Sequence, residues 1–106
     1  IELPIQEKSV KTCWLSFPIL VKKNKFFTRK DLQIFLENNN IQTRVIFSVN
    51  VLKQPLMKKI KYIKTKDCEI QSNKIMQNGI LIGCHQGMKK TELDNICNTF
   101  KKFINL

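Results

Sequence analysis

One arginine lies in a run of polar and apolar residues where it could bind an anion. Arg44 stands between Thr43 and Val45 in the segment 41–50, of which residues 41–47 are predicted to form a strand. An arginine in such a strand either extends its charged end to the surface or holds an anion with its planar guanidinium group. The residues alone leave both interpretations open, and the surface position is the commoner of the two.

The cysteines and the single histidine could in principle bind a metal ion. Cys84 and His85 are adjacent, but Cys13, Cys68 and Cys97 are scattered and form no Cys-x-x-Cys pair, so the spacing typical of zinc sites is missing. Cys97 falls on the apolar face of a predicted helix. We therefore expect buried, reduced thiols in a cytoplasmic protein and no metal site.

The sequence lacks the signatures of a self-contained enzyme. The three glycines, Gly79, Gly83 and Gly87, do not match a phosphate-binding Gly-x-Gly-x-x-Gly loop, and no serine lies between two glycines. Glu92 and Asp94 are two residues apart on a predicted helix, so their carboxylates point in different directions. The residues alone predict a soluble, basic α+β domain without assigning it a reaction.

Strands and helices alternate along the chain, which predicts a small α+β sandwich with helices over one face of a sheet. Pro18 predicts that the first strand lies at a sheet edge or contains a bulge. The expected strands are 13–21, 41–47 and 80–84, and the expected helices are 28–40, 70–78 and 90–104, with a further short helix from Pro55.

Two of these helices have the clearest local signals. Thr28 and Asp31 form a variant of the capping box at the start of the first helix, and the asparagines at 38–40 suit the left-handed conformation that ends it. Apolar stripes at helical spacing follow on both helices. The first is Leu32, Phe35 and Leu36, and the second is Leu93, Ile96, Cys97, Phe100 and Phe103 or Ile104.

Length and charge limit the classes of function. The chain has 106 residues, which suits one domain, and its formal charge of +11 would suit a nucleic-acid partner. Only Arg29 and Arg44 are arginines, however, and the scattered lysines match a general Lys/Asn/Ile bias. No membrane span or signal peptide is visible, and Ile1 in place of Met suggests a piece of a longer protein. A basic nucleic-acid-binding module stays the alternative function.

Several motifs follow one another in an order typical of a known family. They are WLSFPI at 14–19, R-x-x-L and L-E-x-N within 29–39, IQTR at 41–44, Asn50 with Gln54-Pro55, and IGCHQGM at 82–88. Together with Leu3-Pro4, these motifs resemble the C-terminal small domain of the DegT/DnrJ/EryC1/StrS sugar aminotransferases. The CDP-4-keto-6-deoxyglucose 3-dehydratase branch of that family is the most similar.

The resemblance implies PLP fold type I, in which a large domain holds pyridoxal phosphate (PLP) and a small domain closes the sugar site. Residues 13–106 would be the small domain, a short, mostly antiparallel sheet covered by helices, and residues 1–12 a lead-in or linker. The large domain is absent from this sequence, so the isolated chain would bind no PLP and be inactive. The full-length enzyme would be a cytoplasmic homodimer that acts on a nucleotide sugar in cell-surface polysaccharide (lipopolysaccharide) or deoxysugar biosynthesis.

The resemblance also implies roles for three residues. Arg44 would bind substrate or cofactor anions, Asn50 would position a sugar hydroxyl or carbonyl, and His85 would lie on a turn that approaches the site. A turn residue without a role is the alternative for His85. The sequence departs from the branch at Val49, where Gly is usual, and at Gln86, where Pro is usual. Aminotransfer and 3-dehydration both stay open, because the deciding lysine or histidine lies in the large domain.

Overall fold

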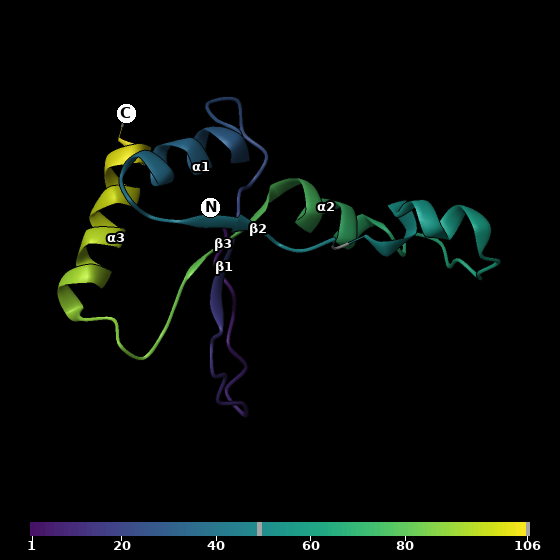
Figure 1. Cartoon of the computed structure of the whole chain (residues 1–106), viewed down its shortest axis with the longest axis horizontal. Coiled ribbons are helices and arrows are strands. Elements are labelled where there is room, and N and C mark those ends of the chain that lie inside the picture. Colours follow the sequence, from purple (N-terminus) through teal and green to yellow (C-terminus); the bar gives the residue numbers. More distant parts are fainter. Residues whose placement is uncertain (49, 106) are drawn as a thin grey trace.

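The structure is a computed structural model that describes residues 1–48 and 50–105, so Val49 and its departure from the family pattern lie outside the described residues. Three strands form an antiparallel sheet in the order β1-β3-β2 (Figure 1). The elements are β1 (Ser16–Leu20), α1 (Arg29–Asn38), β2 (Thr43–Val45), the 3-10 helices η1 (Val51–Lys53) and η2 (Pro55–Lys59), α2 (Ile70–Asn78), β3 (Gly79–Gly83) and α3 (Lys90–Ile104).

The helices match their predicted limits closely, whereas the strands are shorter than predicted. β1 is limited by its partner β3, because each of its five residues pairs with one of the five residues of β3. β2 ends at Val45 because the chain turns at Phe47, whose φ is 29° and whose N–H donates to the Val45 carbonyl oxygen over 3.0 Å. Strand length is therefore set by pairing and by this turn.

Pro18 lies in an edge strand, as predicted. Outside β1, Glu2 forms a single antiparallel bridge, in which the Leu20 N–H donates to the Glu2 carbonyl oxygen over 2.9 Å. Backbone groups two residues apart on a strand point to the same side, so the Pro18 nitrogen also faces away from β3. The missing N–H of Pro18 therefore costs the β1–β3 ladder no hydrogen bond.

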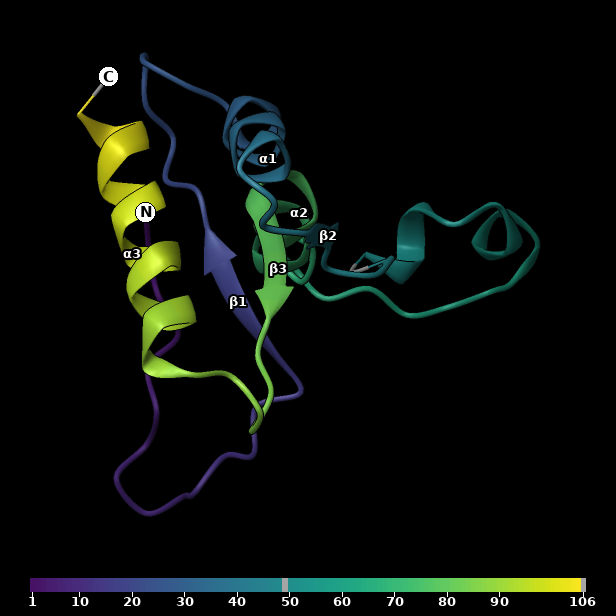
Figure 2. The same cartoon turned by 60° about the vertical axis from the view of Figure 1, so that its left-hand side comes forward.

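The hydrophobic core lies between the sheet and the helices α1 and α3. Ile80 and Ile82 of β3 are buried together with Leu32 and Leu36 of α1, and Phe103 of α3 packs against this cluster. The predicted stripe on α1 is therefore confirmed. The other helix, α2, lies toward the opposite face of the sheet, as Figure 2 shows.

The predicted signals at both ends of α1 are confirmed. The Asp31 N–H donates to Thr28 Oγ1 over 3.3 Å, and the Thr28 N–H donates to Asp31 Oδ2 over 2.7 Å, so the capping box is complete. These bonds from Thr28 to the carboxylate lower the pKa of Asp31. After the helix, Asn40 has a φ of 60°, which is the left-handed conformation expected there.

α3 exposes more of its apolar stripe than predicted. Ile96 and Phe100 pack against the core, but Leu93 is 48% exposed, Ile104 is 59% exposed and Cys97 is exposed. Among the described residues the sheet has three strands, and it leaves part of the stripe uncovered. The helix is therefore half-covered within the described chain.

The prediction of buried thiols is wrong. Cys13 and Cys68 are exposed like Cys97, and Cys84 is half-buried. Cys13 and Cys68 lie in segments outside the core, and Cys84 follows the last residue of β3. The exposure of each thiol therefore depends on the position of the cysteine in the fold, which the residue type alone does not predict.

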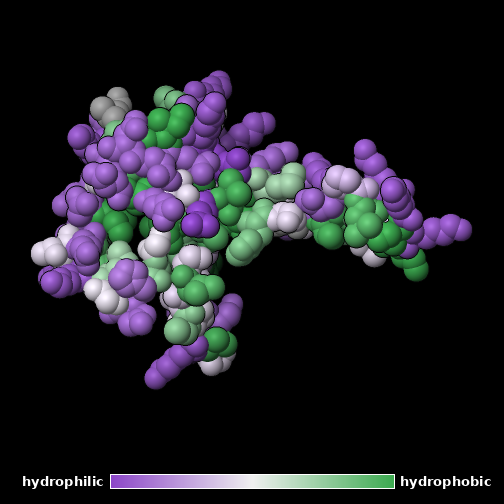
Figure 3. Space-filling view, viewed as in Figure 1, coloured by the Kyte–Doolittle hydropathy of each residue, from purple (hydrophilic) through white to green (hydrophobic). Residues whose placement is uncertain are grey.

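Residues 50–69, here called the arm, project from the rest of the domain between β2 and α2 (Figures 1 and 2). The Cα radius of gyration is 16.3 Å, against about 13 Å for a compact domain of 100 residues. Figure 3 shows apolar atoms gathered along one side of the arm and hydrophilic atoms along the other. Among the described residues, no helix has the length and hydropathy needed to cross a membrane.

Candidate functional site

Arg44 projects from the face of the sheet that is turned away from α1. Its cross-strand partner is Leu81, which lies between the buried residues Ile80 and Ile82 on β3. Successive side chains of a strand alternate between faces, so Leu81 points away from the core. Cross-strand partners share a face, and Arg44 therefore points the same way and is exposed.

An open hollow of about 630 Å³ lies beside Arg44. Its lining is largely apolar and includes Leu15, Val45, Phe47 and Leu81. The ion pairs within the described part of the chain do not involve Arg44. The surface position of this arginine is confirmed, and its guanidinium group is available to an anion supplied from elsewhere.

The end of α1 fixes the start of the strand that carries Arg44. Glu37 Oε1 accepts hydrogen bonds from the Thr43 N–H and, over 2.9 Å, from Thr43 Oγ1. The side-chain amide of Gln33, one turn earlier, donates to the same Oγ1 over 3.2 Å. The glutamate of the L-E-x-N motif and the threonine of the I-x-T-R motif are thus direct partners.

His85 lies on the turn after β3, and its ring is held by the backbone. The Gly87 N–H donates to His85 Nδ1 over 3.1 Å, so in the neutral ring the proton is on Nε2, which is left as a donor. A Cβ atom at Gly87 would stand 3.2 Å from Nδ1, so a larger residue there would require the imidazole ring to shift by a few tenths of an ångström. The ring lines a hollow of about 410 Å³ together with Gln42, Glu92 and Asn95.

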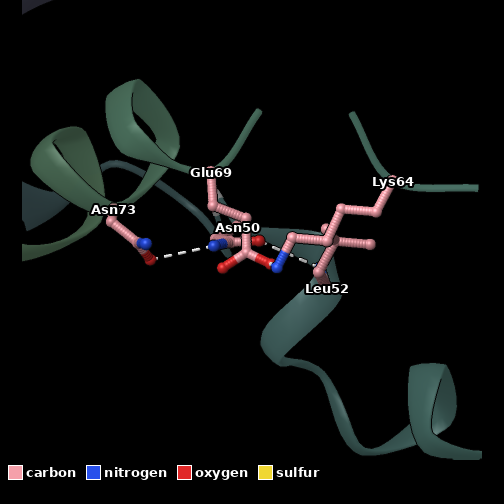
Figure 4. Close-up of polar contacts among 5 residues, drawn as sticks. All are labelled: Asn50, Leu52, Lys64, Glu69 and Asn73. Carbon is pink, nitrogen blue, oxygen red and sulfur yellow. Dashed lines mark hydrogen bonds and ion pairs between the residues drawn. The ribbon is translucent and has the colours of Figure 1, made fainter. Parts of the chain in front are cut away.

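Asn50 lies at the base of the arm and is 2% exposed. Its Oδ1 accepts a hydrogen bond from the Leu52 N–H over 3.1 Å and so caps η1, and its Nδ2 donates to Asn73 Oδ1 over 2.8 Å (Figure 4). Both polar ends of the amide therefore have partners from this chain. The role at the sugar that the family resemblance implies for Asn50 stays a prediction.

An ion pair lies beside Asn50 and joins the two ends of the segment that returns from the arm. Lys64 Nζ is 2.6 Å from Glu69 Oε1 (Figure 4). The bond from Lys64 lowers the pKa of Glu69, with smaller contributions from the amides of Asn50 and Asn73. The same carboxylate raises the pKa of Lys64.

The structure brings two of the three predicted site residues to one end of the sheet. Gln42 and Gly83 line both the hollow beside Arg44 and the hollow beside His85, so the two hollows adjoin. Asn50 lines neither of them. The candidate site is therefore the end of the sheet where β3 stops and β2 starts.

Sequence reasoning missed Gln42 as a site residue. It lies between the two hollows and is exposed. The available signal was its position two residues before Arg44, because residues two apart on a strand share a face. Among the described residues, no group of three or more His, Cys, Asp or Glu side chains is placed to hold a metal ion.

Comparison with known proteins finds similarity to one protein family over nearly the whole chain. Residues 1–101 match the model of the DegT/DnrJ/EryC1/StrS aminotransferase family. The chain is 29% identical over 106 residues to the lipopolysaccharide biosynthesis protein RfbH of Salmonella typhimurium, covering 100% of this chain and 24% of that protein. It is 26% identical over 102 residues to a dTDP-4-dehydro-2,6-dideoxy-D-glucose 3-dehydratase of Saccharopolyspora spinosa, covering 96% and 22%.

A solved structure agrees with these sequence matches. The crystal structure of GDP-4-keto-6-deoxymannose-3-dehydratase with a trapped PLP-glutamate geminal diamine superposes with a TM-score of 0.76 and 26% identity. The match covers 92% of this chain and 25% of that one. The α+β domain expected from the sequence is confirmed as a domain of this fold, and the chain spans about a quarter of the length of the relatives it matches.

Proposed function

The chain belongs to the DegT/DnrJ/EryC1/StrS aminotransferase family, and from this premise we propose that it is the small C-terminal domain of a PLP-dependent nucleotide-sugar aminotransferase or 3-dehydratase. The large domain would hold PLP, which supplies an electron sink when it is bound. The small domain would close the sugar site. The enzyme would act in the cytoplasm as a homodimer in lipopolysaccharide or deoxysugar biosynthesis.

The observation that carries this proposal is the exposed Arg44 on the outer face of the sheet. Its guanidinium group stands beside a largely apolar hollow, and a ligand that fills the hollow would exclude water and so strengthen the attraction between the guanidinium group and an anion. A planar guanidinium group holds two oxygens of a phosphate at once, so it fits the diphosphate of a nucleotide sugar or the phosphate of PLP. Its strand is fixed through Thr43, so the group is presented from a rigid element.

His85 would contribute one hydrogen bond to the same ligand. Its Nε2–H is the free donor of the neutral ring, and sugars offer hydroxyl and carbonyl acceptors. Because the hollow beside His85 adjoins the hollow beside Arg44, one extended ligand could span both. This arrangement suits a sugar joined to a diphosphate better than a small metabolite.

The residues of this chain fit a wall of a cofactor site and not a complete one. The two hollows are open, so this chain would cover a ligand bound there on one side only. The isolated domain is therefore expected to bind no PLP. No observation favours the nucleic-acid alternative, and the names of the relatives reported above do not refer to nucleic acid.

The test is substitution of Arg44 in the full-length enzyme. Arg44→Lys keeps the positive charge but cannot form bidentate hydrogen bonds with a phosphate, so we expect KM for the nucleotide sugar to rise by about tenfold. Arg44→Ala also removes the charge, so we expect a larger rise in KM. Lys30→Ala, which removes an exposed positive charge from α1, is the matched control. Unchanged kinetics in both Arg44 variants would remove this residue from the site.

A further inference from the structure

Gly83, the last residue of β3, is a glycine that the described part of the fold does not require. A Cβ atom at Gly79 would stand 2.6 Å from the Ile75 carbonyl oxygen. One at Gly87 would stand 3.2 Å from His85 Nδ1, whereas one at Gly83 would meet no atom of the described residues within 4 Å, its chain neighbours aside. None of the three glycines has a positive φ. Neither the backbone conformation nor a neighbouring described residue therefore excludes a side chain at position 83.

A glycine in a strand is unfavourable in itself, because it loses more backbone freedom on folding than other residues and packs no side chain. Such a glycine often marks a place where a ligand or another backbone approaches closely. Gly83 is exposed and follows Leu81 by two residues, so a side chain there would project from the outer face of the sheet, which carries Arg44. The open space over Gly83 is therefore available to a group from outside this chain.

This open space lies where the two hollows of the candidate site meet. Gly83 and Gln42 line both the hollow beside Arg44 and the hollow beside His85. Thr43 pairs with Ile82, so the same register continued by one residue places Gln42 opposite Gly83. The Gln42 amide, which has both donors and an acceptor, therefore stands next to a position that has no side chain.

We propose that Gly83 is a specificity-determining residue, over which a nucleotide sugar crosses from the hollow beside Arg44 to the hollow beside His85. This inference rests on the proposed function, which supplies the nucleotide sugar. With the diphosphate at Arg44, the bond to the sugar passes over the bare backbone of Gly83, and the Gln42 amide donates to an oxygen of the sugar. A side chain at position 83 would separate the two hollows, so it would exclude the sugar and leave room for the diphosphate.

A packed segment of protein is the other kind of group that could lie against the bare backbone of Gly83. An apolar segment there would take the Arg44 guanidinium group and the Gln42 amide out of water without giving them partners, which is costly. Phosphate and sugar oxygens can pair with both groups. A polar, extended ligand therefore fits the surroundings of Gly83 better than a packed segment.

The experiment measures binding to the full-length protein by isothermal titration calorimetry with matched pairs of probes. The pairs are CDP and CDP-glucose, dTDP and dTDP-glucose, and GDP and GDP-mannose, and the members of each pair differ only in the sugar. Glucose and mannose lack the 4-keto group in the names of the relatives' substrates, so binding is measured without turnover. The variants are then compared on the pair whose nucleotide sugar binds most tightly to the wild-type protein.

Gly83→Leu should raise the dissociation constant of the nucleotide sugar by at least about tenfold and leave that of the diphosphate unchanged. Gly83→Ala, which adds a single methyl group, should give a smaller rise. Gln42→Met keeps the length of the side chain but cannot donate a hydrogen bond, so it should raise the same constant about threefold. Ser9→Leu, which places a leucine at an exposed position in the lead-in, is the control and should change neither constant.

Three outcomes would overturn the inference. Equal weakening of both members of the pair in Gly83→Leu, together with a lower midpoint of thermal unfolding, would show that protein packs on Gly83. A nucleotide sugar that binds Gly83→Leu as tightly as the wild-type protein would show that nothing crosses there, and the proposed function would stand, because the wild-type protein still binds the sugar. If the wild-type protein binds none of the three nucleotide sugars, the proposed function fails and this inference fails with it.

Discussion

Glu37, at the end of α1, accepts two hydrogen bonds from Thr43, the first residue of β2 and the neighbour of Arg44. The contact closes the connection between a helix and the strand that follows it. It joins the glutamate of the L-E-x-N motif to the threonine of the I-x-T-R motif, six residues later. The position of the guanidinium group therefore depends on a helix that does not itself line the hollow beside Arg44.

Thr43→Val removes the hydroxyl group that Glu37 and Gln33 share. We expect KM for the nucleotide sugar in the full-length enzyme to rise about fivefold, as a net loss of about 1 kcal/mol from these two hydrogen bonds would give, with kcat little changed. Thr12→Val, at an exposed position in the lead-in, is the control. If Thr43 acts through Arg44, Thr43→Val has no further effect on KM in an Arg44→Ala background.

Gly79 joins α2 to β3 in a space that excludes a side chain. A Cβ atom there would stand 2.6 Å from both the Ile75 carbonyl oxygen and Ile46 Cδ1. The Ile46 side chain can move, but the backbone oxygen cannot, so Gly79→Ala should lower the free energy of unfolding by about 1–3 kcal/mol. Urea denaturation measures the change. Gly83→Ala is the control, because its Cβ would meet no atom within 4 Å, and equal effects at both positions would contradict this account.

Local signals explain why the helices could be predicted from the sequence. The Thr28–Asp31 capping box and the left-handed Asn40 each act within a few residues, so α1 is visible in the sequence without knowledge of its neighbours. The same holds for α2, which stops at Asn78 before Gly79 as predicted. In each case the favoured local conformation and the fold agree.

Contacts between distant residues explain what could not be predicted. The outward direction of Arg44 follows from its register with Leu81, and the burial of Asn50 follows from Asn73, 23 residues later. The exposure of Cys97 follows from the part of the α3 stripe that the sheet leaves uncovered. No periodic pattern in one segment encodes such relationships, so the arm and the separation of Asn50 from the other two site residues needed the structure.

The stripe on α1 makes a quantitative prediction for the core. Leu36 is fully buried, and truncation to alanine leaves a cavity among Leu32, Ile80 and their neighbours. Leu36→Ala should therefore lower the free energy of unfolding by about 2–5 kcal/mol. Leu15→Ala, at a residue 91% exposed, should change it by less than about 0.5 kcal/mol. Similar losses in the two variants would place the core elsewhere.

The ion pair at the base of the arm predicts how the arm responds to pH. Glu69 has a pKa below its ordinary value of 4.5 because Lys64 bonds to its carboxylate, so its contribution to stability is present above pH 4.5 and is lost as the pH falls through the lowered pKa. Lys64 has a pKa above 10.5 for the same reason, and its contribution is lost only as the pH rises through that raised value. NMR titration of the Glu69 carboxyl carbon should show a midpoint below 4.5 that moves back up in Lys64→Met. A midpoint that is the same in both proteins would show that the pair does not form in solution.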